Sequence, residues 1–252
     1  MASAVRRILV LHGYAQSGLL LSKRMGALRK ACGPKVEFVF LDAPMILQPT
    51  DLFGPTLEDL QAAEASGADP ALRARGWWTP APATAVGLDT SLALLRDTLK
   101  GSRFNGVFGF SQGAALAALV AALLERPEVY PPFLVDGKPP HPPFEFCVAV
   151  SGFRVKDPLA ATIDQGSYTT PTLHLMGRND VVVVAERSQT LIDISQNKQV
   201  VIHDGGHFVP LKTQWRKWLA EYLKDHTTTL PPPKDSPDIS SEATESGTAT
   251  PS

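Results

Sequence analysis

Short apolar runs without polar alternation recur along most of the chain, and each has the length of a β-strand. Valine, isoleucine, leucine and phenylalanine dominate them, which is typical of strands buried on both faces. The runs are 8–11, 36–41, 106–108, 146–150, 172–176 and 199–203. They predict a six-stranded, mainly parallel sheet, because parallel sheets are covered on both faces.

The segments between these runs repeat apolar residues at helical spacing. The predicted helices are 19–31, 87–99, 112–124, 184–195 and 210–223. In the last of them Trp215, Trp218 and Leu219 face inward, and Pro210 suits the first helical turn. Strands that alternate with helices predict an α/β fold with helices on both faces of the sheet. Such folds bind ligands at the carboxyl ends of their strands.

Two proline-rich stretches interrupt this alternation. The first, 44–85, has no sustained period apart from a possible short helix at 57–65, and it contains Trp77 and Trp78. A long irregular segment inside a compact domain is usually functional, so we expect a lid or pocket wall inserted after the second strand. The alternative is a surface excursion whose tryptophans pack on the body of the domain. The second stretch is 127–143.

The last part of the chain has a different composition. From residue 227 the sequence is threonine, serine, proline and acidic residues, with almost no apolar side chains. Such a segment cannot bury enough surface to order itself. We therefore expect one domain over 1–226 and a disordered tail over 227–252.

Overall composition narrows the class of protein. Of the 252 residues, 44% are hydrophobic and 19% are charged, which suits a globular domain with one sizeable core. The net charge of −1 does not favour a nucleic-acid partner. The N-terminus lacks the pattern of a signal peptide, and no apolar run is long enough to span a bilayer. Cys32 and Cys147 lie in or beside apolar segments, so we expect free thiols and a cytoplasmic location.

A Gly-x-Ser-x-Gly pattern at 109–113 lies directly between the third predicted strand and the helix that follows it. In that context the pattern predicts a nucleophile elbow, a tight turn that exposes the hydroxyl of Ser111. Gly109 and Gly113 leave room where a Cβ would hit the neighbouring strand or helix. The first amide of the new helix, Gln112 N–H, would then point toward the group that the serine attacks.

A serine nucleophile needs an adjacent base, and the base needs an orienting carboxylate. The α/β-hydrolase order of serine, acid and histidine is met here by Ser111, Asp180 and His207. His207 alone among the six histidines lies in a glycine-flanked loop after the last predicted strand. Asp180 follows the fifth strand. The alternatives are that Asp204 is the acid, or that Asp180 only caps the next helix.

The other five histidines are expected to serve elsewhere. His174 and His203 lie within predicted strands and are interpreted as structural. His141 lies in the second proline-rich stretch, and His226 lies in or near the tail. His12 belongs to the loop after the first strand.

A developing oxyanion needs two hydrogen-bond donors. We predict that these are the backbone N–H groups of Gln112 and Tyr14, the latter in the loop after the first strand. Both are backbone roles, so neither side chain is required for them. The sequence contains no metal-ligand, dinucleotide or phosphate-binding pattern, and no cofactor is predicted.

Eight short motifs are spread along the chain between residues 8 and 223. They are Leu11-His12-Gly13-Tyr14, Asp42-Ala43-Pro44, Trp77-Trp78, Gly87-Leu88, Gly109-Phe110-Ser111-Gln112-Gly113-Ala114, Ser151-Gly152-Phe153, Gly177-Arg178-Asn179-Asp180 and Gly206-His207-Phe208-Val209-Pro210. Together they resemble the fungal family of serine hydrolases, abbreviated FSH, which has a mammalian counterpart named as an ovarian-cancer-associated protein. The resemblance implies an α/β-hydrolase fold without its two leading strands, a Ser–Asp–His triad, and carboxylesterase or thioesterase activity.

The resulting prediction is a serine esterase that acts on small-molecule acyl esters or thioesters. Apolar residues beside the motifs are expected to line an acyl pocket, namely Phe110, Trp77, Trp78, Phe153 and Phe208. One alternative is a thioesterase that releases polyketide or other acyl groups from a carrier. The other is a non-catalytic binding module on the same fold. A homodimer is left open.

Overall fold

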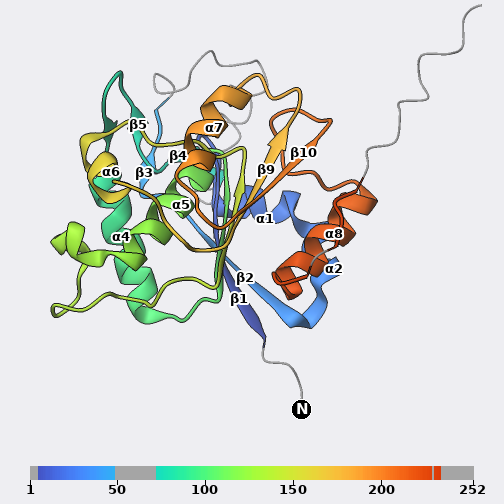
Figure 1. The fold of residues 1–252 in the computed structure, drawn as a ribbon, viewed down its shortest axis with the longest axis horizontal. Helices are drawn as coiled ribbons and strands as arrows, with labels where there is room; N and C mark the ends of the chain where they lie inside the picture. The colour runs from blue at the N-terminus through green and yellow to red at the C-terminus, as the bar shows by residue number, and fades with distance from the viewer. Residues whose placement is uncertain (1–4, 49–71, 229, 234–252) are drawn as a thin grey trace, which may run out of the picture.

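The computed structural model describes residues 5–48, 72–228 and 230–233. Its centre is a six-stranded sheet in the order β10-β9-β8-β7-β1-β2, and every neighbouring pair is parallel (Figure 1). The strands are β1 Arg6–Leu11, β2 Val36–Leu41, β7 Gly106–Phe110, β8 Phe146–Val150, β9 Thr172–Gly177 and β10 Lys198–His203. The six predicted strands are therefore confirmed.

The strand order reverses between β1 and β7. From β1 the chain moves outward to β2, then returns to β7 on the other side of β1 and continues outward to β10. In sheets of this kind the loops at such a switch point leave a crevice at the carboxyl ends of the strands. The loop after β1 and the turn after β7 meet at that crevice.

Helices cover both faces of the sheet. One face carries α1 Gly18–Arg24, α2 Gly26–Cys32 and α8 Thr213–Lys224, and the other carries α4 Leu88–Gly101, α5 Gln112–Glu125, α6 Pro158–Ile163 and α7 Ala185–Asp193 (Figure 1). From Gln112 to Leu124 every residue of α5 is buried, because this helix is enclosed between the sheet and its neighbours. Within the described residues no helix is long and apolar enough to cross a membrane.

Three helical details differ from the sequence prediction. The helix predicted over 19–31 is two helices, α1 and α2, which meet at Met25. The last helix begins at Thr213 instead of Pro210, because Lys212 has an extended ψ of 152° and ends the preceding loop. The short helix α6 was not predicted, although the sequence offers a signal for it: the side chain of Asp157 accepts the N–H of Leu159, and Pro158 opens the helix.

The described ends of the first proline-rich stretch return to the body of the domain. Strand β3 Met45–Ile46 pairs with β4 Arg75–Gly76, and β5 Thr79–Pro80 pairs with β6 Ala85–Val86. Trp77 and Trp78 lie between β4 and β5, and both are buried in the core. The possible helix at 57–65 lies outside the described residues, as does most of the predicted lid.

The second proline-rich stretch is compact. It contains two single-turn 3₁₀ helices, η4 Pro127–Val129 and η5 Pro131–Phe133, and the ring of Phe133 is buried. The His141 Nε2 atom accepts the N–H of Phe104, just before β7. This stretch therefore packs at the amino end of β7, away from the crevice.

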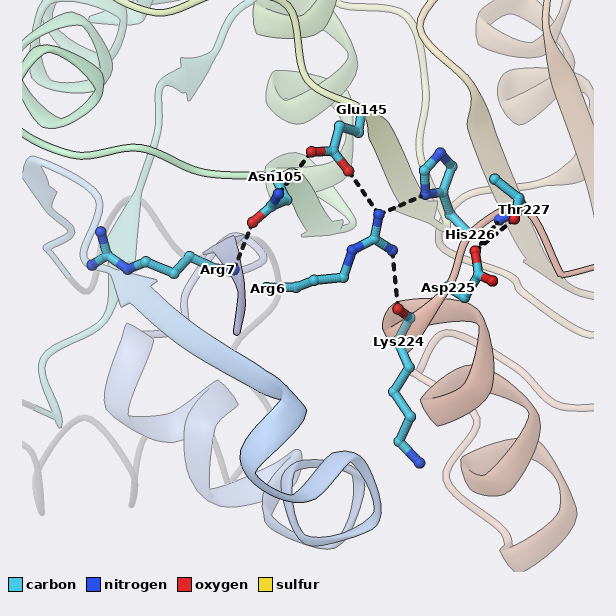
Figure 2. A network of polar contacts seen from close by, with 8 residues as sticks. All are labelled: Arg6, Arg7, Asn105, Glu145, Lys224, Asp225, His226 and Thr227. Atoms are coloured by element: carbon cyan, nitrogen blue, oxygen red, sulfur yellow. Dashed lines mark hydrogen bonds and ion pairs between the residues drawn. The ribbon is translucent and has the colours of Figure 1, made fainter. Parts of the chain in front are cut away.

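A polar network closes the amino edge of the sheet (Figure 2). Arg6 donates to a Glu145 carboxylate oxygen at 2.7 Å, to His226 Nδ1 at 3.1 Å and to the carbonyl of Lys224 at 3.2 Å. Asn105 Nδ2 donates to the other Glu145 oxygen at 2.7 Å. The network therefore connects the first strand, the loop before β8 and the end of α8. Residues 234–252, which make up most of the predicted tail, lie outside the described residues.

Candidate active site

The turn between β7 and α5 has the geometry of a nucleophile elbow. Ser111 adopts φ 54° and ψ −118°, a backbone conformation that side-chain-bearing residues rarely adopt. A Cβ on Gly109 would lie 2.3 Å from the carbonyl oxygen of Gly113, and a Cβ on Gly113 would lie 2.2 Å from that of Leu11. Both glycines are therefore needed for α5 to start directly against β1 and β7.

Ser111, Asp180 and His207 lie together at the carboxyl edge of the sheet. The distance from His207 Nε2 to Ser111 Oγ is 3.0 Å, and the distance from His207 Nδ1 to Asp180 Oδ2 is 2.8 Å. Since the carboxylate only accepts, we assign the ring proton to Nδ1, which leaves Nε2 free to accept the serine proton. The loops after β7, β9 and β10 each supply one of the three side chains.

Asp180 is buried, and its carboxylate accepts several hydrogen bonds. Its other oxygen, Oδ1, accepts the N–H groups of Val182 at 3.0 Å and Val183 at 2.8 Å. Burial raises the pKa of this carboxyl, but hydrogen bonds from the Val183 amide and from His207 outweigh it, and the pKa is below its usual value. The Ser151 hydroxyl is nearby but falls short of hydrogen-bond geometry, so we count only the amides and His207 as partners.

The other candidates for the catalytic acid and base have partners elsewhere. Asp204 is exposed and pairs with Arg178 at 2.8 Å. His174 and His203 are buried within their strands, and burial lowers the pKa of His174 to about 4. His226 belongs to the network at the opposite edge. Of these acid and histidine candidates, Asp180 and His207 are therefore the two that are arranged like a catalytic pair.

His12 has a position that the sequence analysis did not anticipate. It is buried beside the crevice, and its Nε2 accepts the N–H of Ala43 at 3.0 Å. Nδ1 therefore carries the proton and donates to the carbonyl of Gly13 at 2.7 Å. Burial lowers the pKa of His12 to about 4, which keeps the ring neutral. Because the Gly13 carbonyl and the Tyr14 N–H belong to one planar peptide unit, this bond also fixes the direction of the N–H.

The side chain of Gln112 also has a role that we did not expect. Its Oε1 accepts the N–H of Trp77 and its Nε2 donates to the carbonyl of Trp78, both at 2.8 Å. The Trp77 indole donates in turn to the carbonyl of His12 at 2.8 Å. Three buried hydrogen bonds thus join the elbow, the loop after β1 and the Trp77-Trp78 segment.

The five predicted pocket residues occupy different environments. The Trp77 ring has no exposed surface, so in this structure it supports the β1 loop and is not open to a substrate. The rings of Trp78 and Phe153 meet edge to face with centroids 6.4 Å apart, and the Phe110 ring lies 5.0 Å from that of His207. Phe208 is 48% exposed and packs on one side against His203.

One of these rings, that of Phe153, borders a small cavity. This cavity of about 10 Å³ lies between α5, α6 and α7, beneath Phe153, which is room for about one water and not for an acyl chain. Among the described residues no group of three or more histidine, cysteine, aspartate or glutamate side chains could hold a metal ion.

Comparison with known proteins agrees with this arrangement. The family model "Serine hydrolase (FSH1)" matches residues 1–219. The chain is 33% identical over 243 residues to Esterase OVCA2 of Danio rerio, covering 89% of this chain and 99% of that one. It is 30% identical over 239 residues to Esterase OVCA2 of Xenopus tropicalis, covering 89% and 94%.

The fold has relatives among solved structures. Acyl-protein thioesterase 2 of Zea mays superposes with a TM-score of 0.55 at 21% sequence identity, covering 88% of this chain and 95% of that one. That identity supports a shared α/β-hydrolase fold only. The family model and the two esterases go further, since they match most of the chain, and the family model spans residues 1–219, which include the elbow and both partner loops. The chain belongs to the FSH1 family of serine hydrolases.

Proposed function

We propose that the protein hydrolyses carboxylic esters or thioesters of acyl groups through an acyl-enzyme intermediate on Ser111. The observation that supports this best is the continuous hydrogen-bonded series from Ser111 through His207 to Asp180, at 3.0 and 2.8 Å, on a strained elbow. A serine at an ordinary glycine turn needs neither the strain nor a buried histidine–carboxylate pair.

Each residue then has one role in the reaction. His207 accepts the Ser111 proton as the hydroxyl attacks the acyl carbon, and Asp180 stabilises the imidazolium that forms. The Gln112 and Tyr14 N–H groups donate to the oxyanion. The tetrahedral intermediate collapses, and His207 gives its proton to the departing alcohol or thiol. A water molecule, activated by the same histidine, then attacks the acyl carbon and releases the acid.

Ester and thioester substrates share this path, because both yield the same acyl-enzyme. A thioesterase acting on a carrier-bound acyl group, such as a polyketide, remains part of the proposal. The solved relative named acyl-protein thioesterase 2 shows that the fold accommodates such chemistry in that protein. A non-catalytic binding module is the less favoured candidate, since the three side chains of a triad are present and in contact.

A cytoplasmic location is also proposed. Cys32 and Cys147 are both buried and free, and burial raises their thiol pKa values to about 11 and about 12. Free thiols persist most readily in a reducing compartment. The homodimer stays a prediction.

Labelling with a neutral fluorophosphonate probe tests the proposed function without a guess at the substrate. The wild-type protein should form a single adduct on Ser111, and Ser111→Ala should abolish it and lower ester turnover by about 10⁴-fold or more. Ser102→Ala, at the end of α4, is the matched control and should label normally. A protein that is folded but unlabelled, or labelled on another residue, would favour the binding module or another nucleophile.

A further inference from the structure

Arg187 lies in the first turn of α7 with its guanidinium carbon over an aromatic ring. Its Cζ atom is 3.7 Å from the centroid of Phe153. The residue is exposed, and within the described part of the chain no carboxylate lies within ion-pair distance of it. It differs in this from Arg154, which follows Phe153 directly and binds Asp164 through two hydrogen bonds.

The acidic residues of the described segments that carry Phe153 and Arg187 are already engaged. Asp164 is bound to Arg154 at 2.7 and 2.8 Å. Asp157 accepts the amides of Ala85 and Leu159, both at 2.8 Å. Asp180 is held by His207 and two amides. Glu186 precedes Arg187, but adjacent residues on a helix do not face each other.

The described residues therefore provide no counter-charge for this cation. Burial lowers the pKa of Arg187, and no nearby carboxylate opposes that effect. Taking a charge partly out of water costs free energy unless an opposite charge offsets it. The ring of Phe153 offsets some of the cost through a cation–π contact, but the N–H donors at the edge of the guanidinium have no acceptor among the residues that the structure describes.

The position of this cation links it to the proposed reaction. Phe153 follows β8, which lies between the strands that precede Ser111 and Asp180. A Cβ on Gly152 would lie 3.3 Å from the Cβ of Ala114, three residues after Ser111. Helix α7 begins directly after the Asp180 loop, and its N-cap is Val184. Arg187 thus stands at the same sheet edge as the triad.

The contact between the rings of Phe153 and Trp78 connects Arg187 with the nucleophile elbow. The Phe153 ring meets Trp78, and the carbonyl of Trp78 is bound by the side chain of Gln112, which follows Ser111. A substrate lying against Trp78 and Phe153 would therefore bring part of its structure within reach of the guanidinium.

We propose that Arg187, held over the ring of Phe153, binds an anionic group of the substrate, so that the enzyme prefers esters or thioesters that carry a carboxylate or phosphate. This inference rests on the proposed function. Guanidinium groups bind both anions through paired N–H donors of fixed geometry. The anion can lie on the acyl part, as in a dicarboxylic half-ester, or on the leaving group, as in a phosphate-bearing thiol.

Two substrate pairs distinguish these sources. The first pair compares the p-nitrophenyl half-ester of glutarate with p-nitrophenyl valerate, which has the same acyl length without the charge. The second compares butyryl-coenzyme A with S-butyryl-N-acetylcysteamine, which lacks the phosphates. In at least one pair, wild-type kcat/KM should favour the anionic member by about tenfold or more, the usual effect of a charged hydrogen bond. The pair that shows the preference identifies the side that carries the anion.

Arg187→Met keeps an apolar cover over Phe153 and removes the charge. It should bring the anionic-to-neutral ratio of kcat/KM close to one. Arg187→Lys should restore only part of the ratio, because an ammonium lacks the guanidinium fork. Arg178→Met removes an exposed charge at the same sheet edge and is the matched control, which should retain most of the wild-type ratio.

The outcomes separate the two proposals. A wild-type enzyme that hydrolyses the valerate ester but shows no anion preference in either pair would contradict the role of Arg187 alone. That role is equally contradicted if Arg187→Met keeps the wild-type ratio while Ser111 still reacts with the neutral fluorophosphonate. Failure of wild-type protein to hydrolyse any of the four substrates, together with no labelling of Ser111, would contradict the proposed function itself.

Discussion

The two edges of the central sheet are built differently. In the described part of the chain, four non-glycine residues have positive φ, and three of them, Ala15, Ser111 and Ser151, lie in the turns that follow β1, β7 and β8 at the carboxyl edge. The fourth, Asp136, lies in the second proline-rich stretch, and none of the residues that form the network at the amino edge has a positive φ. There Arg6, Glu145 and Asn105 bind one another, and His226 and the end of α8 complete the network (Figure 2).

This contrast separates what serves chemistry from what serves stability. Residues in rare backbone conformations persist only where the surrounding structure compensates for them, and they concentrate at functional sites. The carboxyl edge also holds a neutral buried His12, an ionised Asp180 and an arginine for which the described residues offer no counter-charge. Substitutions at the carboxyl edge should therefore change turnover most, and those at the amino edge should change stability.

The largest effect is expected at Asp180. Asp180→Asn should lower kcat by about 10⁴-fold, because an amide favours the wrong tautomer of His207. Asp204→Asn is the matched control, since Asp204 pairs with Arg178 on the same edge, and it should keep most of the activity. Steady-state kinetics on one neutral ester are sufficient. A greater loss in Asp204→Asn than in Asp180→Asn would reverse the assignment of the acid.

His12 should have the next largest effect, although it does not touch the proposed nucleophile. His12→Ala frees the Gly13–Tyr14 peptide, so the second oxyanion donor is no longer directed, and kcat should fall by about 10²-fold with little change in KM. His12→Asn keeps a donor near the position of Nδ1 and should recover part of the loss. Affinity for a trifluoromethyl ketone, which forms an oxyanion on serine, should fall in parallel with kcat. Unchanged ketone affinity would assign His12 to folding alone.

Substitutions of the two tryptophans should have different effects, on stability for Trp77 and on substrate preference for Trp78. Trp77 is fully buried with its indole bonded to His12, so Trp77→Ala should lower the free energy of unfolding by about 3–5 kcal/mol. Trp78 contacts Phe153, so Trp78→Ala should flatten the rise of kcat/KM from acetate to longer p-nitrophenyl esters. Each methylene bound against a ring contributes about 0.8 kcal/mol. Parallel chain-length profiles for wild type and Trp78→Ala would leave Trp78 without a role in the pocket.

Substitutions at the amino edge should have the smallest effect, and this effect should be on stability only. Burial, and then the charge of Arg6, lower the pKa of His226, while Glu145 and Asp225 partly oppose them. The folded protein therefore binds this proton less well than the unfolded chain, and stability is lost as the pH falls below about 6.5, the ordinary histidine value. Between about pH 7.5 and about pH 5.5, Tm should fall less in His226→Gln than in wild type. Turnover at neutral pH should be the same in both proteins, and a large difference would contradict the separation of the two edges.

Much of the fold was predictable because its elements are long or uniformly apolar. All six strands are short apolar runs, and between turn signals a run of that length and composition favours a strand of a parallel sheet. The two-residue strands β3 to β6 could not be predicted, because two residues are too few to show an alternating pattern, and β3 and β4 also pair between segments that are distant in the sequence. The start of α8 at Thr213 was also out of reach, since Pro210 is compatible with either a helix or a loop.

The residues of the candidate site likewise divide into those that could be predicted from the sequence and those that could not. Ser111, Asp180 and His207 could be proposed from sequence because side-chain chemistry and chain order both constrain them. The role of His12 was missed because its ring acts on the neighbouring Gly13–Tyr14 peptide. The role of the Gln112 side chain was missed because it binds the Trp77 segment, which has no periodic pattern in the sequence. Arg187 cannot be distinguished from the other arginines in the sequence, because its contact with Phe153 is visible only in the structure.

Trapping the acyl-enzyme tests the central proposal most directly. During hydrolysis of a slowly released ester such as p-nitrophenyl pivalate, an acid quench followed by peptide mass spectrometry should find the acyl group on the peptide containing Ser111. The same treatment of Ser111→Ala, whose fold is checked by its circular dichroism spectrum, should find no acylated peptide. Hydrolysis by the wild type with the acyl group on another residue, or by Ser111→Ala at more than about a tenth of the wild-type rate, would contradict the account.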